Sequence, residues 1–197
     1  MFQELRAAFT LLIFLTLLTG LGYPMLTTAA GQAFFPNQAN GSLISEDDKI
    51  IGSEIIGQNF ISDKYFNPRP SAAGKGYDAA NSSGSNLAIT SKKWLALVDA
   101  RVKELRKKSD NRPIPVDLVT ASGSGLDPDI SVSAAKFQAV RIAKIRGISL
   151  QQVEKLIALH TTPRTFGVLG EKRVNVLKIN RALDRITSLP KSRSPTP

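Results

Sequence analysis

The stretch AAFTLLIFLTLLTGLGYPML, residues 7–26, contains twenty residues without a single charge. As an α-helix that rises about 1.5 Å per residue, twenty residues span roughly 30 Å, the thickness of the hydrocarbon core of a bilayer. Thr10, Thr16 and Thr19 are compatible with such a helix, because a threonine hydroxyl can donate to a backbone carbonyl one turn earlier. The stretch therefore predicts a membrane-spanning helix.

A cleaved signal peptide is the alternative interpretation of the same stretch. Residues 28–30, Thr-Ala-Ala, have the small-x-small pattern of a cleavage site. Against cleavage, Arg6 is the only basic side chain ahead of the apolar run, and Glu4 offsets its charge. The run also continues past the length of a signal-peptide core to Leu26. Both interpretations export the remainder of the chain.

The charges that flank the helix predict its orientation. No lysine or arginine occurs between Arg6 and Lys49. Because cytoplasmic flanks of membrane helices carry an excess of basic residues, the flank that follows this helix lacks a cytoplasmic retention signal. We therefore expect a cytoplasmic N-terminus, a single pass through the cell (inner) membrane, and an extracytoplasmic domain.

Composition narrows the chemistry of that domain. The 197-residue chain has no cysteine, which excludes disulfides, thiolate metal sites and a cysteine nucleophile. Its net charge of +10 is concentrated at one end, since residues 131–197 hold 13 basic and 3 acidic residues while residues 40–130 hold 12 of each. Such a surplus is typical of a surface that faces nucleic acid, lipid headgroups or an acidic protein.

Hydrophobic periodicity and capping residues predict one mixed α+β domain that is rich in helix in its C-terminal half. The expected boundaries are an anchor at 1–30, the domain at 31–189 and a disordered tail at 190–197. The expected elements are a hairpin at 41–52 with its turn at 45–48, an irregular polar segment at 63–91, and helices at 92–108, 133–146, 149–160 and 174–186. For the start of the last helix, residues 173–176, the alternating pattern leaves a strand as the alternative.

No pattern of a catalytic site appears in the sequence. His160 has no thiol or metal-ligand companion at a recognised spacing, and a histidine at a helix end usually caps or packs. Asp127 and Asp129 flank a proline in an expected turn, where carboxylates serve the turn and the following helix dipole. We expect a non-enzymatic protein with no catalytic residues and no metal site.

One local pattern offers a different function. Ala143, Gly147 and Val153 have the spacing of a helix-turn-helix DNA reader, in which alanine permits close packing, glycine turns the chain and valine re-enters the core. Any corner between two helices uses the same spacing, and an exported domain does not meet DNA. Nucleic-acid binding is therefore kept as the alternative function.

Several segments together resemble the C subunit of the bacterial Kdp-type potassium-transporting ATPase. The longest is DLVTASGSGLDP at residues 117–128. Shorter matching segments lie at 38–44, 56–60, 65–66, 69–72, 84–87, 160–161, 169–171 and 173–177. They follow one another in order behind the N-terminal helix. In this sequence Ser83-Gly84-Ser85 stands where many members have a double glycine, and Asp129 stands where histidine is common.

The resemblance implies a single-pass accessory subunit of a complex that hydrolyses ATP to import potassium. The implied partners are a potassium-conducting subunit, a P-type subunit that hydrolyses the ATP, and membrane lipid, with no nucleic acid. The implied role is to stabilise assembly and to act as a catalytic chaperone that raises the ATP affinity of the P-type subunit. No tightly bound cofactor is implied.

The resemblance also implies a nucleotide motif in one loop, formed by Ser83, Gly84, Ser85 and Asn86. Backbone amides of such a small polar loop could cradle a phosphate. ATP is cytoplasmic, however, and the charge pattern places this loop on the other side of the membrane. We therefore favour a conformational effect on nucleotide affinity over direct contact.

We predict that a reporter active only in the cytoplasm is silent when it is fused after Ile186. The flank that follows the helix has no basic residue before Lys49, so we expect the domain that carries the reporter to be exported. The same fusion made on a chain that lacks residues 7–26 is the control, and it should be active. Reporter activity in the fusion that retains the helix would contradict the predicted orientation.

Overall fold

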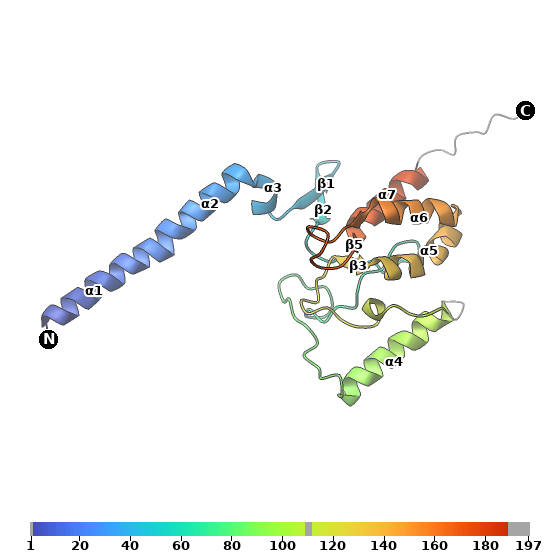
Figure 1. Cartoon of the computed structure of the whole chain (residues 1–197), viewed down its shortest axis with the longest axis horizontal. Coiled ribbons are helices and arrows are strands. Elements are labelled where there is room, and N and C mark those ends of the chain that lie inside the picture. The colour runs from blue at the N-terminus through green and yellow to red at the C-terminus, as the bar shows by residue number, and fades with distance from the viewer. Residues whose placement is uncertain (1, 109–111, 189–197) are drawn as a thin grey trace, which may run out of the picture. The chain divides into compact units, whose positions relative to one another are not determined.

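The computed structural model describes residues 2–108 and 112–188 of the chain. The chain forms two compact units, Met1–Ser53 and Glu54–Pro197 (Figure 1). The predicted boundary between anchor and domain at residue 30 stays a prediction, and the predicted disordered tail lies outside the described residues. The helices of the second half and the short strands confirm a mixed α and β region behind an N-terminal helix.

The first unit begins with a helix long and apolar enough to cross a membrane, Phe2–Phe34. It consists of α1 (Phe2–Leu17), a π-helical turn η1 (Leu18–Gly22) and α2 (Tyr23–Phe34). The expected hydrogen bond is confirmed at two of the three threonines, since the hydroxyl of Thr10 donates to the carbonyl of Arg6 at 2.8 Å and that of Thr19 to the carbonyl of Leu15 at 2.7 Å. These bonds leave no hydroxyl proton of Thr10 or Thr19 facing an apolar solvent.

The same unit ends in the predicted hairpin, after the short helix α3 (Pro36–Ala39). Strands β1 (Leu43–Glu46) and β2 (Lys49–Ser53) pair antiparallel. Asp47 and Asp48 form the turn with φ angles of 49° and 59°. Two consecutive left-handed residues are what a tight two-residue hairpin turn requires, and aspartate tolerates that conformation. The strands therefore extend closer to the turn than the predicted loop at 45–48.

The second unit contains four helices and one small sheet in its described part. Each predicted helix is present within a few residues of its expected bounds. In chain order the elements are α4 (Lys92–Lys107), η2 (Val116–Leu118), β3 (Asp129–Ser131), α5 (Val132–Arg146), α6 (Leu150–Leu159), β4 (Thr161–Thr162), β5 (Arg173–Asn175) and α7 (Val176–Ser188). The predicted irregular segment is also confirmed, since residues 54–91 contain neither helix nor strand.

The sheet is antiparallel in the order β3–β5–β4. Val174 at its centre pairs with Ile130 on one side and Thr161 on the other, and it is fully buried. The alternative of a strand is therefore confirmed for residues 173–175, and the helix expected from residue 174 begins at Val176 instead. Strands β3 and β4 were not predicted, because three and two residues are too few to show an alternating pattern.

Local sequence signals determine where the helices begin and end. The hydroxyl of Ser91 accepts from the backbone of Trp94 at the start of α4. Ser149 and Gln152 form the predicted capping box at the start of α6. Gly147 ends α5 in the left-handed conformation with a φ of 63°, which glycine adopts without steric cost.

Helices α5, α6 and α7 enclose the core. Ile142, Ile157 and Ile179 are at most 1% exposed, and they come from one helix each. Ala134, Ala135 and Ala139 are also buried on α5, where short side chains let neighbouring backbones approach closely. Phe66, which comes from the irregular segment, is fully buried in the same cluster.

Two buried side-chain amides attach the irregular segment to these helices. Asn180 on α7 accepts from the N–H of Phe66 at 2.8 Å and donates to its carbonyl at 3.0 Å. Gln138 on α5 does the same for Asn67, at 2.8 and 3.1 Å. An amide side chain offers one acceptor and two donors, so each can pair with the backbone of a residue as a neighbouring strand would. We call these contacts the amide clamps.

We predict that Asn180→Leu lowers the free energy of unfolding by roughly 2–4 kcal/mol, because two buried backbone groups of Phe66 lose their partners while the branching and the number of side-chain heavy atoms are kept. Thermal unfolding followed by circular dichroism measures the effect. Lys144→Ala on the exposed side of α5 is the control and should change little. Equal melting temperatures of the two variants would show that water replaces the two hydrogen bonds of Asn180 to Phe66.

Candidate functional site

The loop that carries the implied nucleotide motif, residues 83–86, lies against a second loop of the same unit, residues 122–126. The N–H of Ser83 donates to the carbonyl of Ser124 at 2.9 Å, and the hydroxyl of Ser82 donates to the same carbonyl at 3.0 Å. The hydroxyl of Ser83 donates to the carbonyl of Gly84 at 2.9 Å. Two groups that a phosphate would need from Ser83 therefore already have partners within the protein.

Glycines make this approach of two backbones possible. A Cβ on Gly84 would lie 2.8 Å from the carbonyl oxygen of Gly123. A Cβ on Gly125 would lie 2.5 Å from the carbonyl oxygen of Ser83 and 2.7 Å from the nitrogen of Ala73, and the φ of Gly125 is +67°. Distances this short are closer than van der Waals contact, so a side chain at either position would push the loops apart.

The rest of the motif faces solvent. Ser85 and Asn86 are exposed, and Asn86 has a left-handed φ of 51°. Asparagine is one of the few residues that adopt this conformation readily, so the turn at Asn86 is compatible with its residue type. The four predicted site residues are thus adjacent, with half of the motif in loop packing and half available at the surface.

Charged residues of the long matching segment also hold the fold together. Asp127 accepts from Arg69 at 3.0 Å and from the N–H of Asp129 at 3.0 Å. Asp117 accepts from the N–H and the hydroxyl of Ser131 at 2.8 and 3.1 Å, and Ser131 in turn caps α5. The expectation that Asp127 serves its turn is confirmed.

Tyr77 supports the same region from the irregular segment. Its hydroxyl donates to the backbone carbonyl of Arg69, and its N–H donates to the hydroxyl of Ser71 at 2.8 Å. Burial raises the pKa of Tyr77 to about 12, since the phenolate would be poorly solvated there. Tyr77 is therefore a neutral hydrogen-bond donor at physiological pH rather than an acid or base.

A polar groove of about 550 Å³ lies beside the small sheet. Its lining includes Asp129, His160 and Arg173, together with Glu54, Ile55, Pro128, Leu159, Thr161, Thr162, Asn175 and Lys178. No sequence pattern relates His160 to Asp129, because they come to line the same groove only when β3 and β4 pair with β5. The expected role of His160 at a helix end is confirmed, since it is the C-cap residue of α6 and its Nδ1 lies 2.9 Å from the carbonyl of Leu156.

The charges in this groove are mostly paired. Arg173 contacts Asp129 at 3.0 Å, and Lys178 contacts Glu54 at 2.7 Å. Burial, with the nearby charge of Asp127, raises the pKa of Asp129, and Arg173 opposes that rise. Within residues 2–108 and 112–188 no three histidine or carboxylate side chains are grouped as metal ligands. The groove therefore lacks a metal centre of that kind in the described chain.

Some of the excess basic residues in the C-terminal third stabilise the fold. Arg141 donates to the carbonyl of Tyr65 at 3.0 Å and to the side chain of Asn67 at 2.8 Å. Arg146 contacts Asp184 at 2.9 Å, and its guanidinium lies 4.9 Å from the centre of the Tyr65 ring. Both arginines bind the irregular segment to the helices.

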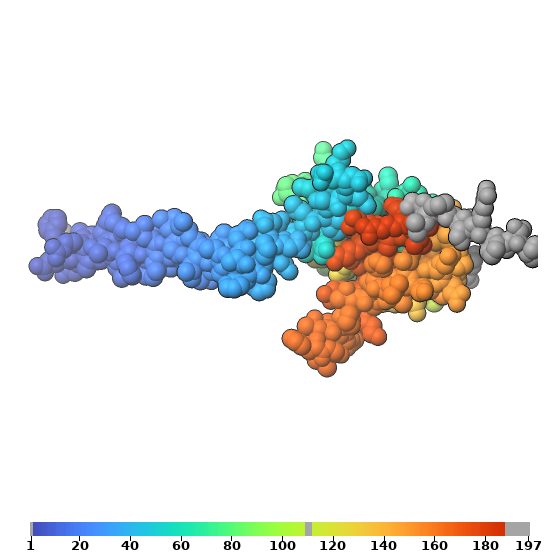
Figure 2. Space-filling view, turned by 90° about the horizontal axis from the view of Figure 1, so that it is seen from above, coloured from blue at the N-terminus to red at the C-terminus, as the bar shows by residue number. Residues whose placement is uncertain are grey.

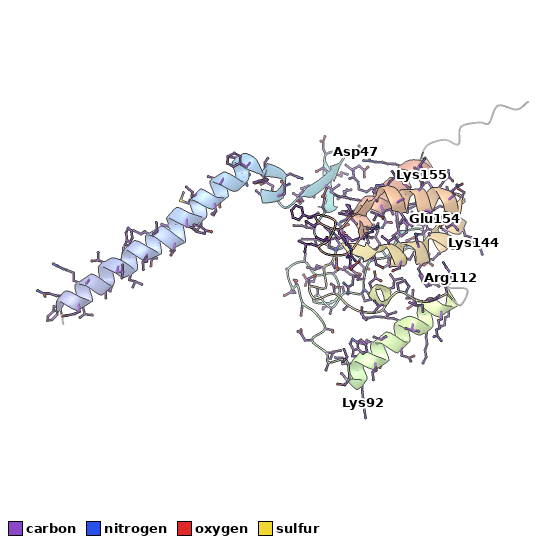
Figure 3. The ribbon with its side chains drawn as sticks, in the orientation of Figure 1. Asp47, Lys92, Arg112, Lys144, Glu154 and Lys155 are labelled. Carbon is purple, nitrogen blue, oxygen red and sulfur yellow. The ribbon has the colours of Figure 1, made fainter. Side chains whose placement is uncertain are left out.

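Other basic side chains remain at the surface. Figure 3 labels Lys144 on α5 and Lys155 on α6, next to Glu154, and all three are exposed.

Lys108 and Arg101 line a separate cavity of about 340 Å³ between α4 and α5. Lys108 contacts Asp63 at 3.1 Å, and Arg101 donates to the carbonyl of Val119 at 2.9 Å.

A helix long and apolar enough to cross a membrane, followed by a mixed α and β domain, is the arrangement of a single-pass membrane protein. Comparison with known proteins specifies the class further. The family model described as K⁺-transporting ATPase, c chain, matches residues 5–185. The chain belongs to this family, KdpC, and the resemblance found in the sequence is confirmed.

Curated relatives agree over nearly the whole chain. A protein of Mycobacterium tuberculosis (strain H37Rv) is 55% identical over 188 residues, which cover 93% of this chain and 99% of the relative. One of Methylococcus capsulatus is 52% identical and covers 94% and 100%, and one of Rhodospirillum rubrum is 50% identical and covers 93% and 96%. All three are named potassium-transporting ATPase KdpC subunit.

The helix-turn-helix alternative receives no support from these comparisons. Ala143 and Val153 are buried and Gly147 is left-handed, as the spacing predicts. In this protein Ala143 and Val153 pack in the helical core, and the exposed Gly147 turns the chain between α5 and α6. The spacing correctly predicted a local structure that serves another purpose.

We predict that Gly125→Ala destabilises the domain by about 2 kcal/mol or more, because the methyl group would collide with Ser83 and alanine disfavours a left-handed φ. Gly123→Ala, in the same loop, is the matched control, since its Cβ would meet no atom within 4 Å. Thermal unfolding of both variants measures the difference. Similar stability of the two would mean that the loops separate without cost.

Proposed function

We propose that this protein is the accessory, non-catalytic subunit of a potassium-transporting ATPase complex. Membership of the family over residues 5–185 is the observation that carries the proposal. The relatives are named subunits of that ATPase, which implies partner subunits. ATP hydrolysis and potassium conduction then belong to those partners, and this chain stabilises their assembly.

The N-terminal helix attaches the subunit to the membrane, with its N-terminus in the cytoplasm and its domain outside. The absence of basic residues between Arg6 and Lys49 supports this orientation. Thr16, Gly20 and Gly22 give the helix small side chains along part of its length, and a Cβ on Gly20 would meet no atom within 4 Å. Small residues let a partner helix approach closely in a bilayer, where packing replaces the hydrophobic effect.

The subunit acts on ATP affinity from a distance. The loop at residues 83–86 lies outside the membrane in this proposal, whereas ATP is cytoplasmic. The bonds of Ser83 to Ser124 and Gly84 give that residue a structural role that needs no nucleotide. A subunit that binds one conformation of the pump more tightly than another shifts the pump toward that conformation, and it thereby raises the pump's apparent affinity for a ligand that prefers the same conformation.

We predict that the double variant Ser83→Ala, Asn86→Ala changes the apparent KM of the assembled complex for ATP by less than about threefold. Direct contact would predict a rise of at least tenfold, because each lost hydrogen bond to a charged phosphate is worth roughly 1.5–3 kcal/mol. ATPase assays at varied ATP concentration measure KM, after copurification has shown that the variant assembles normally.

A tenfold rise in KM with intact assembly would contradict the proposed action at a distance. Calorimetric titration of the full-length wild-type chain with ATP supplies the independent measurement. Heat of binding to the isolated chain would place nucleotide contact in this subunit. Its absence, together with an unchanged KM, is the result that we expect.

A further inference from the structure

The connection between β4 and β5 exposes apolar side chains at its tip. We call residues 163–172 the apolar loop. Phe166 is 90% exposed, Val168 71% and Leu169 59%. Figure 2 shows the orange lobe at this part of the sequence standing away from the other atoms of the second unit. Three neighbouring large apolar side chains this exposed mark a surface that meets something other than water.

The backbone of the apolar loop is paired with itself. Thr165 and Leu169 exchange two hydrogen bonds, each of 2.9 Å from nitrogen to oxygen. The N–H of Gly167 donates to Arg164 at 3.1 Å, and that of Val168 donates to Thr165 at 3.2 Å. The loop is therefore an ordered turn whose tip needs few hydrogen bonds from water.

An unfavourable backbone conformation accompanies this exposure. Phe166 has a φ of 53°, and Gly167 follows with a φ of 79°. Glycine adopts positive φ freely, but a bulky aromatic residue seldom does. Strain at a surface position indicates that the presentation of this ring has a use, because nothing in the core requires it.

Basic residues lie at the base of the loop. These basic residues are Arg164, Lys172 and Arg173, and they are opposed by Glu171 and by Asp129 of β3, so three positive and two negative charges leave +1. Arg164 contacts Glu171 at 2.6 Å, and Arg173 contacts Asp129 at 3.0 Å. All three basic side chains are exposed.

We propose that the apolar loop inserts its tip into the outer surface of an anionic lipid bilayer. Phe166, Val168 and Leu169 enter the boundary between headgroups and acyl chains, while the basic residues at the base remain among the phosphates. This arrangement matches the chemistry of interfacial membrane anchors, which combine an apolar face with lysine and arginine. The inference rests on the membrane attachment in the proposed function.

A lipid surface fits the loop better than a protein socket does. A leaflet that contains anionic lipid carries a negative surface charge, which complements the net positive charge at the base of the loop. The self-paired backbone at the tip suits a medium that cannot replace lost hydrogen bonds. A chain anchored by its own helix also keeps the domain near a bilayer permanently, so weak insertion is sufficient.

The chain has no cysteine, so one introduced thiol can be labelled selectively. An environment-sensitive fluorophore is attached to the thiol of the variant Val168→Cys, which keeps Phe166 and Leu169 in place. The full-length chain is inserted into nanodiscs of phosphatidylcholine with or without phosphatidylglycerol, some containing acyl chains that bear a nitroxide quencher. We expect blue-shifted emission that the nitroxide lipids quench, more strongly with phosphatidylglycerol and less at high salt.

Two comparisons make the result specific. The label at Glu154→Cys, on an exposed position of α6, should be insensitive to nitroxide lipids. Phe166→Asp in the Val168→Cys chain should abolish quenching, and circular dichroism checks that this exposed substitution leaves the fold intact. Retained quenching in that variant would contradict insertion by the tip.

The remaining outcomes also decide the matter. Insertion of the chain into nanodiscs without quenching at Val168 contradicts the lipid proposal alone. A blue shift that appears only when the other subunits of the complex are added, without quenching by lipids, assigns the loop to a protein interface and also overturns the proposal. A chain that does not enter nanodiscs at all contradicts the membrane anchor and the loop proposal together.

Discussion

The amide clamps of Gln138 and Asn180 are the constraint on which the second unit depends. Residues 54–91 form no helix or strand of their own, yet they place Phe66 at the centre of the core. A buried backbone without partners would cost more than the ring contributes, and the two side-chain amides provide those partners at Phe66 and Asn67. The salt bridge of Arg69 with Asp127 and the donors of Arg141 then extend the attachment along the same segment.

Helices were predictable because their signals are local. The capping box of Ser149 and Gln152 predicts the start of α6, and Gly147 predicts the end of α5, each from a few neighbouring residues. The sheet was only half predictable, because β3 and β4 are defined by their pairing with β5 and not by any pattern of their own. Of the candidate site, the adjacency of Ser83, Gly84, Ser85 and Asn86 follows from the sequence. The packing of that loop on Gly125 does not, since about forty residues separate them and no periodicity relates two loops.

The motif that looked most like a ligand site is therefore partly an element of architecture. Gly84 and Gly125 permit two loops to touch through their backbones, and Asp127 holds the nearby arginine. The loop contact requires glycine at these positions whether or not a ligand is present. The apolar loop shows the opposite case, because Phe166 contributes little to the core and its exposure has no structural explanation within the domain. Function in this subunit is best sought where the fold does not need the residue.

The clamp at Asn180 also determines the order in which this protein can fold. Phe66 and its partner are 114 positions apart in the chain. During synthesis the irregular segment emerges first, and it waits while more than a hundred further residues are made. Contacts between such distant positions form late, after the local helices, because a long loop must close to make them. The backbone of Phe66 therefore has no Asn180 partner until α7 has been made, whereas the loop at residues 83–86 can already pair with Ser124, about forty positions later in the chain.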